Sequence, residues 1–217
     1  MIIGIVGKMG MGKTSLMVYL AGRYWKTGKT YYSDIWIKSL VGKLEKWSFE
    51  GAFFFWLGLR KGRYMIPSSN YREFEQKGEL YAIPSGSVAL VDEAPVYFDS
   101  KARDFLPLYV RKKITDSRKD GIDLWWSAQR LRSVSTDLRE NTHIYIDVYS
   151  LPLLPYGWLR LYLTKEYSDI NENCTFEGLK PYRKRWYLLR KKHLDSYDTY
   201  QKIHPEMSDV PVENKEN

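Results

Sequence analysis

Cysteine and histidine are scarce in this sequence of 217 residues, which has one cysteine, Cys174, and three histidines. A lone cysteine excludes an internal disulfide and any metal site built from several cysteines, and it fits a reducing compartment. No second histidine lies at metal-ligand spacing from His143, so a packed or surface role is expected for it. These absences argue against a secreted, disulfide-rich protein and favour an intracellular one.

Long apolar runs are also missing. The most lipid-like stretch, residues 51–59, is closed by Arg60 and Lys61 after nine residues, whereas a helix needs about 20 apolar residues to span a bilayer. Residues 148–163 are interrupted by two prolines and an arginine, and no basic region precedes the apolar residues 2–6. We therefore predict no transmembrane span and no signal peptide, and we find neither internal repeats nor heptads.

What the sequence does have is a glycine-rich segment, residues 7–14, directly after the apolar residues 2–6. It matches the pattern G-x-x-x-x-G-K-[ST] in its required context of a buried strand, a tight turn and a helix start. Glycine lets backbone N–H groups turn towards phosphate oxygens without side chains in the way. The alternative is a glycine-rich turn without a ligand. The predicted nucleotide-binding residues are Gly7, Lys8, Met9, Gly10, Met11, Gly12, Lys13, Thr14 and Ser15.

Within this segment, Lys13 is expected to place its charge on the β- and γ-phosphates, and the Thr14 hydroxyl is expected to coordinate Mg²⁺. Residues 88–91 are apolar and are followed by two carboxylates, Asp92 and Glu93. Ligands bind at the carboxyl ends of parallel strands in open α/β sheets. We expect Asp92 to hold the Mg²⁺ shell and Glu93 to polarise a water for attack on the γ-phosphate. A strand followed by a solvated acidic turn is the alternative, which the phosphate loop upstream disfavours.

Gln129 follows another strand, expected over residues 122–127. Beside the nucleotide-binding strand, a glutamine at this point can contact both the γ-phosphate and the attacking water, and it can thereby sense which nucleotide is bound. The alternative is an ordinary loop glutamine.

The remaining pattern predicts one α/β domain with a largely parallel central sheet flanked by helices. Further strands are expected at residues 30–37, 142–149 and 159–164, helices at 71–80 and 98–119, and a polar loop at 168–178. We divide the chain into a core at 1–165 with an aromatic and basic insertion at about 38–70, a small basic C-terminal extension at 166–206 and a disordered tail at 207–217. The insertion suits single-stranded nucleic acid, or it packs as a lid against the core or a partner subunit.

The net charge of +8 favours an anionic partner such as nucleic acid or a membrane surface. Residues 180–192 concentrate basic and aromatic side chains and are the best candidate for salt-sensitive contact with a phosphate backbone. A solvated face or a dock for an acidic partner is the alternative. The residues proposed for nucleic-acid contact are Arg183, Lys184, Arg185, Arg190, Lys191 and Lys192.

Residues 116–130 and 138–141, together with the two motifs above, resemble the FtsK–HerA superfamily of DNA-pumping ATPases. Within that superfamily the chain is most similar to the zonular occludens toxin (Zot) type, the assembly ATPases of filamentous phages, and residues 197–199 match a tripeptide that such proteins often carry. The likeness covers most of residues 1–149. The most specific part of this likeness is the order along the chain of an arginine, a glycine, a strand and a glutamine. The phosphate-binding motifs are less specific, because many ATPases share them.

The resemblance implies a RecA-like P-loop fold, ATP and Mg²⁺ as cofactors, and catalytic roles for Lys13, Glu93 and Gln129. It also implies a homo-oligomeric ring, usually a hexamer, in which an arginine of one subunit reaches the γ-phosphate of its neighbour. Arg118 matches the arginine before the sensor strand, and Arg139 and Arg111 are the alternative arginine fingers. For each of them the other interpretation is a solvated cation on a helix surface.

The function that the resemblance implies is ATP hydrolysis coupled to translocation of viral DNA during virion assembly or genome packaging. Zot-type proteins commonly continue into a membrane-spanning helix and an outer domain, and we expect neither in this sequence. This difference favours a likeness to the packaging ATPases of membrane-containing icosahedral viruses, which belong to the same superfamily. Expected partners are viral DNA, capsid or virion-assembly proteins and a peripheral membrane contact. The expected location is the host cytoplasm, the virion or the inner-membrane surface. A nucleotide-gated scaffold with little turnover and a P-loop small-molecule kinase are the alternatives.

Overall fold

One mixed β-sheet of eight strands organises the described part of the chain. The computed structural model describes residues 1–23, 29–35, 37, 71–74, 77–101, 108–153 and 159–190. The expected insertion at about 38–70 and the expected tail at 207–217 lie outside these residues. The strands are β1 (Ile2–Val6), β2 (Tyr31–Ser33), β3 (Tyr71–Glu73), β4 (Val88–Val91), β5 (Asp123–Ala128), β6 (Ile144–Pro152), β7 (Leu159–Tyr167) and β8 (Arg183–Arg190).

The sheet is largely parallel, as the sequence predicted. Its strand order is β3-β2-β4-β5-β1-β6-β7-β8. The strands from β3 to β6 run parallel, while β6, β7 and β8 pair antiparallel. β1 pairs with β5, so the strand before Gln129 lies beside the strand that leads into the phosphate loop. The carboxyl ends of β1, β4 and β5 therefore lie at one edge of the sheet.

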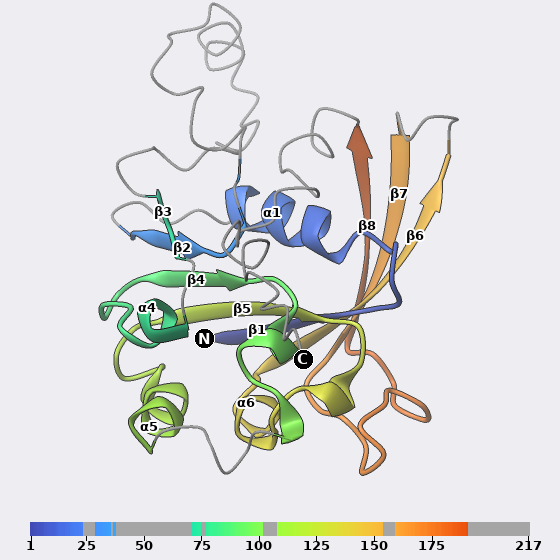
Figure 1. The fold of residues 1–217 in the computed structure, drawn as a ribbon. Coiled ribbons are helices and arrows are strands. Elements are labelled where there is room, and N and C mark those ends of the chain that lie inside the picture. The colour runs from blue at the N-terminus through green and yellow to red at the C-terminus, as the bar shows by residue number, and fades with distance from the viewer. Residues whose placement is uncertain are drawn as a thin grey trace, which may run out of the picture.

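Helices cover both faces of the central strands (Figure 1). The helix α1 (Lys13–Arg23) lies on one face, and α4 (Lys77–Tyr81), α5 (Leu108–Asp116) and α6 (Thr136–Glu140) lie on the other. Every residue of β1, β4 and β5 is buried, as expected of parallel strands covered on both sides. Short 3₁₀ helices, η2 (Ala94–Val96) and η4 (Leu131–Ser133), follow β4 and β5.

The prediction of a helix over residues 71–80 is partly wrong. Residues 71–73 form β3, which pairs in parallel with β2, and α4 begins only at Lys77. Tyr71 decides this outcome, because its ring is buried in the sheet and its hydroxyl donates to the backbone carbonyl of Ile35. The charged side chains of Arg72 and Glu73 suggested a helix, yet exposed charges are also typical of an edge strand.

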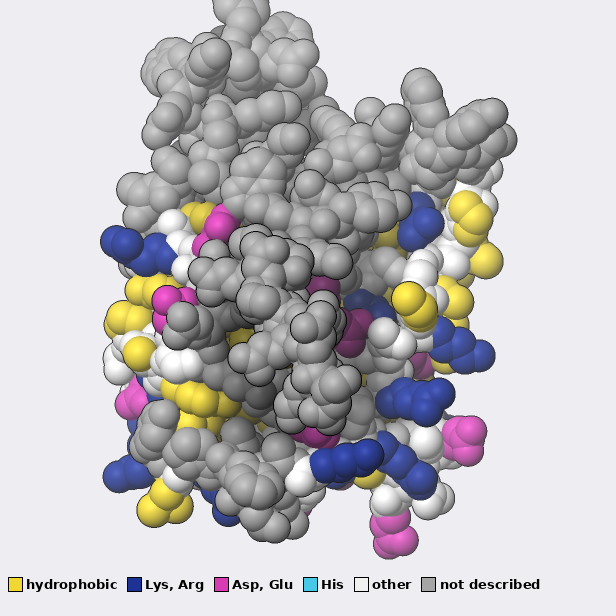
Figure 2. Space-filling view, viewed as in Figure 1, with side chains coloured by type: hydrophobic (Ala, Val, Ile, Leu, Met, Phe, Trp, Pro, Cys, Tyr) yellow, Lys and Arg dark blue, Asp and Glu magenta, His cyan; other side chains and the backbone are white. Residues whose placement is uncertain are grey.

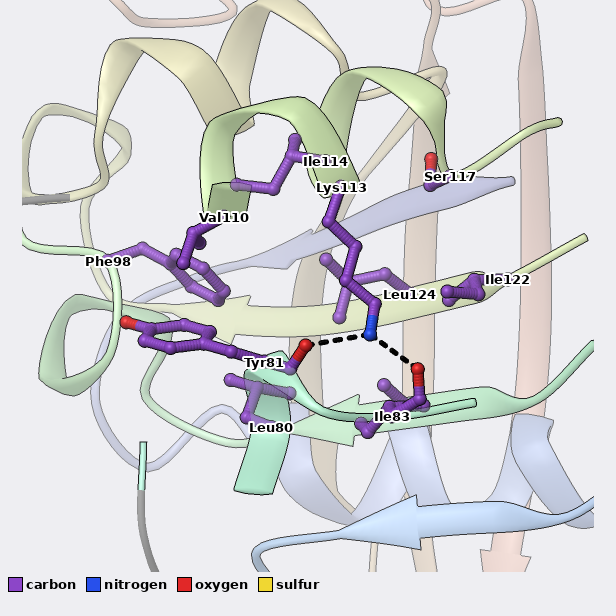
Figure 3. A pocket seen from close by; sticks show the side chains of 11 residues that line it. Leu80, Tyr81, Ile83, Phe98, Val110, Lys113, Ile114, Ser117, Ile122 and Leu124 are labelled. Carbon is purple, nitrogen blue, oxygen red and sulfur yellow. Dashed lines mark hydrogen bonds between the residues drawn. The ribbon is translucent and has the colours of Figure 1, made fainter. Parts of the chain in front are cut away.

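The helix predicted over residues 98–119 is shorter in the structure. Phe98 is a buried core residue outside any helix, and α5 spans Leu108–Asp116. Lys113 of α5 reaches over an apolar pocket and donates hydrogen bonds to the carbonyl oxygens of Tyr81 and Ile83 (Figure 3). Desolvation lowers the pKa of Lys113. These hydrogen bonds tie α5 to the segment that joins α4 to β4. No residue of the phosphate loop lines the pocket.

The chain continues beyond β6 as an antiparallel hairpin. The strand predicted at 159–164 is present as β7, and the polar loop predicted at 168–178 contains no helix or strand. Residues 183–190, which we expected within a basic extension, form β8 at the edge of the same sheet. The described part of the predicted extension therefore contributes to the sheet.

Trp126 of β5 lies at the centre of the core and depends on one hydrogen bond. Its ring is fully buried, and Nε1 donates to the Thr142 hydroxyl at 3.1 Å, while that hydroxyl donates to the Leu138 carbonyl at 2.7 Å. We expect Thr142→Val to lower the free energy of unfolding by about 1–3 kcal/mol, because both buried partners lose their hydrogen bonds. Urea unfolding measures this loss. The control is Thr115→Val at an exposed position of α5, which should change the free energy of unfolding by less than about 0.5 kcal/mol. Equal losses of stability in the two variants would contradict the explanation.

Candidate nucleotide-binding site

Residues 7–12 form a loop that joins the end of β1 to the start of α1. Gly10 and Gly12 adopt positive φ angles of 77° and 72°, which side chains with a Cβ rarely reach. The Leu16 N–H donates to the Gly12 carbonyl at 3.0 Å, so helical hydrogen bonding begins directly after the loop. The free N–H groups at a helix start attract anions, and the loop therefore has the backbone geometry that the motif predicted.

The side chains that follow the loop lie at the sheet edge. Lys13 is 6% exposed, which is unusual for a lysine and is consistent with a charge kept for a bound anion. The Thr14 hydroxyl donates to Asp92 Oδ2 at 2.9 Å. The structure thus brings together the two residues that the sequence assigned to Mg²⁺, although 78 positions separate them.

Asp92 is held by groups from three other elements. Its Oδ2 accepts from Thr14 of α1, and its Oδ1 accepts from the Ser127 hydroxyl of β5. Its backbone N–H donates to both carboxylate oxygens of Asp34, at 2.9 and 3.0 Å. Burial raises the pKa of the Asp34 carboxyl well above its ordinary value, and the hydrogen bond from Asp92 opposes this shift only in part. The position of Asp92 is therefore determined by tertiary contacts on every side.

Glu93 has an unusual backbone conformation, with φ 51° and ψ 60°. A residue other than glycine in this left-handed region costs on the order of 1 kcal/mol or more. The conformation is supported by a hydrogen bond from its N–H to the Ser127 hydroxyl at 3.2 Å. It directs the side chain to Gln129, whose Nε2 donates to Glu93 Oε1 at 3.1 Å. The two residues that the sequence assigned to the attacking water are in direct contact.

The oxygen donors at this edge suit a magnesium ion. Thr14 and Asp92 offer a hydroxyl and a carboxylate, which are hard ligands that Mg²⁺ accepts. Within the described residues no cluster of three or more His, Cys, Asp or Glu side chains could hold a metal on its own. Mg²⁺ usually takes one or two protein ligands and fills its remaining positions with water and phosphate oxygens, so the donor set fits a metal that arrives with a nucleotide.

The three candidate arginine fingers differ in the contacts that their side chains make. Arg139 donates from Nε to the Val134 carbonyl at 3.0 Å and from Nη2 to Thr136 at 3.2 Å, and its Nη1 contacts the Cys174 sulfur. Arg111 lies 3.6 Å from the Asp137 carboxylate. Arg118 is exposed and lies just before the amino end of β5, at the sheet edge opposite Gln129. Arg118 therefore cannot reach the phosphate loop of its own subunit, whereas Arg139 holds local structure.

The residues predicted to contact nucleic acid lie on or after β8. Arg185 is bound to the buried carboxylate of Glu166 at 2.7 Å, so this arginine stabilises the hairpin. Arg183 and Lys184 are exposed, and Trp186 on the face of Lys184 is 61% exposed. In Figure 2 cationic side chains are spread over the right-hand side, where β6, β7 and β8 lie in Figure 1. The Arg190 side chain and residues 191–192 lie outside the description.

Sequence reasoning missed the two residues that hold Asp92. Asp34 directly follows β2, and Ser127 is the fully buried penultimate residue of β5. Asp34 was missed because the predicted strand ran over residues 30–37 and placed it in the interior, whereas β2 ends at Ser33 and leaves Asp34 at the carboxyl end, as Asp92 is for β4. Ser127 carries no such signal, because a small hydroxyl within a strand is common. A second pair, Arg160 and Tyr162 of β7, lies against the phosphate loop and was also missed.

The comparisons with known proteins concern structure alone, because no family model and no curated protein matches this chain. The crystal structure of the N-terminal domain of zonular occludens toxin from Neisseria meningitidis is similar to it with a TM-score of 0.56. The two are 18% identical, and the match covers 91% of this chain and 98% of the other. The chain has the zonular occludens toxin fold. The resemblance predicted from the sequence is thereby confirmed for the fold.

Two further structures are more distant. One is the DNA-packaging ATPase B204 of Sulfolobus turreted icosahedral virus, at 15% identity and a TM-score of 0.45, covering 78% of this chain and 98% of that one. The other is the genome-packaging NTPase B204 of Sulfolobus turreted icosahedral virus 2 in complex with ATP-γS, at 13% identity and a TM-score of 0.44 with the same coverage. Among the residues that the structure describes, no helix has the length and apolar character needed to cross a bilayer.

The two left-handed glycines of the phosphate loop make different contacts. A Cβ on Gly10 would meet no atom within 4 Å, whereas a Cβ on Gly12 would overlap the Tyr162 hydroxyl. We expect Gly10→Ala to lower the free energy of unfolding by about 1–2 kcal/mol, because alanine is strained in this left-handed backbone conformation. Gly12→Ala should cost about 1–3 kcal/mol more, because it also overpacks the core. Thermal unfolding of the two variants gives the comparison, and indistinguishable melting temperatures would refute the close approach of Tyr162.

Proposed function

We propose that this protein is a P-loop ATPase that hydrolyses ATP with Mg²⁺. The observation that carries the proposal is the convergence of two contacts beside the phosphate loop. Thr14 bonds to Asp92, and Gln129 bonds to Glu93. These contacts join the groups needed for metal and water to the loop needed for phosphate, from three separate segments of the chain. A glycine turn without a ligand gives no reason for this convergence.

In the proposed mechanism the loop N–H groups and Lys13 bind the β- and γ-phosphates. Mg²⁺ held by Thr14 and Asp92 would, when bound, neutralise charge on these phosphate oxygens. Glu93 accepts a proton from the attacking water, and Gln129 orients that water through its contact with Glu93. Ser127 holds the carboxylate of Asp92 and the backbone of Glu93 in one arrangement.

We further propose that hydrolysis drives translocation of viral DNA, during genome packaging or virion assembly, by a homo-oligomeric ring. The Zot-like fold and the net charge of +8 support this proposal. Arg118 is the trans arginine in this arrangement, since it is exposed and lies at the edge remote from its own phosphate loop. Lys184 and Arg183 of β8 contact DNA phosphates. Capsid or virion-assembly proteins are the other partners, and the host cytoplasm, the virion or the inner-membrane surface is the location.

Phosphate release by the purified protein tests the ATPase proposal. We expect Lys13→Ala to lose nucleotide binding and turnover, because it removes the charge beside the phosphates. Glu93→Gln should keep binding and lose turnover by about 10²-fold or more, because it removes the general base. The exposed Glu140→Gln on α6 is the matched control and should behave as wild type. Binding without turnover in the wild type would indicate a scaffold, and a phosphorylated acceptor would indicate a kinase.

Mixed oligomers test the trans arginine. Arg118→Ala and Glu93→Gln should each be inactive alone, and mixing them should restore part of the DNA-stimulated turnover. At one type of mixed interface an intact Glu93 site meets an intact Arg118. An arginine finger raises the rate of hydrolysis by about 10³-fold or more. Mixing Lys13→Ala with Glu93→Gln is the control, since both changes break the site of their own subunit. Absence of recovery in demonstrably mixed oligomers would contradict the assignment of Arg118.

A further inference from the structure

The β6–β7 hairpin forms a wall against the phosphate loop that the proposed mechanism does not use. A Cβ on Gly7 would lie 2.8 Å from the Val148 carbonyl of β6, and Gly12 packs against Tyr162 of β7. Arg160 of β7 reaches the apex of the loop, where its Nη1 donates to the Gly10 carbonyl at 3.4 Å. The loop therefore approaches the hairpin at its start, its apex and its end.

Register explains why Arg160 lies at this edge. β6 runs parallel to β1, so its carboxyl end lies at the edge that carries the phosphate loop. β7 runs antiparallel to β6 and pairs Arg160 with Pro152, the last residue of β6. Arg160 is therefore presented beside the loop by the rigid sheet and needs no rearrangement to face it.

Within the described part of the chain, Tyr162 and Arg160 both carry buried polar atoms that have no hydrogen-bond partner. Tyr162 is fully buried, and among the described residues its hydroxyl has no hydrogen-bond partner. The same holds for Nε of Arg160, while the contact of Nη1 with Gly10 is long. A buried donor without an acceptor is costly, and for a charged guanidinium the cost is larger. Both side chains lie beside a loop whose shape suits phosphate, which would supply the missing acceptors.

The strand order shows which end of a nucleotide these residues would face. β4 and β5, which carry Asp92, Glu93 and Gln129, lie on one side of β1, and β6 and β7 lie on the other. A γ-phosphate under attack must lie towards Glu93. The opposite side of the loop, which Arg160 occupies, therefore faces the phosphate nearest the nucleoside.

We propose that Arg160 binds the nucleoside-proximal phosphate in its own subunit and that Tyr162 is the positioning residue for the Gly12 turn. This inference rests on the proposed nucleotide binding and adds a second half to that site. The guanidinium presents several donors in a fixed plane, so it can exchange the weak contact with Gly10 for charge-assisted hydrogen bonds to phosphate. β7 then acts as the nucleoside-side wall of the site, opposite the catalytic carboxylates.

Equilibrium binding of ATP and ADP to the full chain distinguishes this role from a γ-phosphate contact. Arg160→Gln should lower the affinity for ATP and for ADP by the same factor, about tenfold, because both nucleotides contain the phosphate that Arg160 binds. Gln129→Ala should weaken ATP while leaving ADP unchanged. Arg132→Ala is the matched control, because Arg132 is exposed and its Nε donates to the Asn173 carbonyl. Unchanged affinities for Arg160→Gln, or a larger loss for ATP than for ADP, would overturn the proposal.

Failure of the inference can be separated from failure of the proposed function. If wild type binds both nucleotides and Lys13→Ala does not, the nucleotide site stands whatever Arg160→Gln does. If wild type binds neither nucleotide, the ATPase proposal fails first, and the role of Arg160 fails with it. Arg160→Lys should recover less than half of the lost binding free energy, because lysine keeps the charge and loses the planar fork.

Tyr162→Phe tests the positioning role. Without nucleotide its melting temperature should equal or exceed that of wild type, because the change removes a buried hydroxyl that has no partner among the described residues. The rise in melting temperature on adding ADP should be smaller than in wild type. A lower melting temperature without nucleotide would show that the hydroxyl has a structural partner within the protein, and an unchanged response to ADP would remove Tyr162 from the site.

Discussion

The carboxylate of Asp92 is the constraint on which the site depends. It accepts hydrogen bonds from Thr14 and Ser127, and the N–H of the same residue is bound by Asp34. These partners come from α1, β5 and the residue after β2, so Asp92 at the end of β4 is positioned only when all three neighbouring elements are in place. Parallel pairing makes this arrangement possible, because it puts the carboxyl ends of neighbouring strands at one edge.

Positioning these groups has an energetic cost that the rest of the fold offsets. Asp34 is a buried carboxyl whose pKa is raised by desolvation, Glu93 has a left-handed backbone, and Lys13 is a buried lysine. Each feature lowers stability by itself. Large apolar clusters on both faces of the sheet provide the compensating stability. Strain concentrated beside a glycine-rich loop is typical of a site organised for ligand binding in place of maximal stability.

Strand order also divides the edge into two functional sides. The carboxylates and Gln129 lie on the β4–β5 side of the phosphate loop, and the hairpin with Arg160 and Tyr162 lies on the other. A bound nucleotide would thus have its reacting end at the carboxylates and its nucleoside end at β7. The exposed Arg118 lies at the opposite edge of the sheet, remote from the phosphate loop of its own chain. Arg160 and Arg118, which look alike in the sequence, thereby acquire different surroundings.

The sequence by itself determined the phosphate loop, the two acidic residues after β4, Gln129 and the largely parallel sheet. These features depend on local chemistry, namely glycine for a tight loop and short apolar runs for buried strands. The tertiary structure alone decided that residues 71–73 pair as β3, that Asp34 and Ser127 hold Asp92, and that Arg139 has local partners while Arg118 is exposed. These outcomes depend on strand register and on which distant segments come into contact. The spacing of residues along the chain determines neither of them.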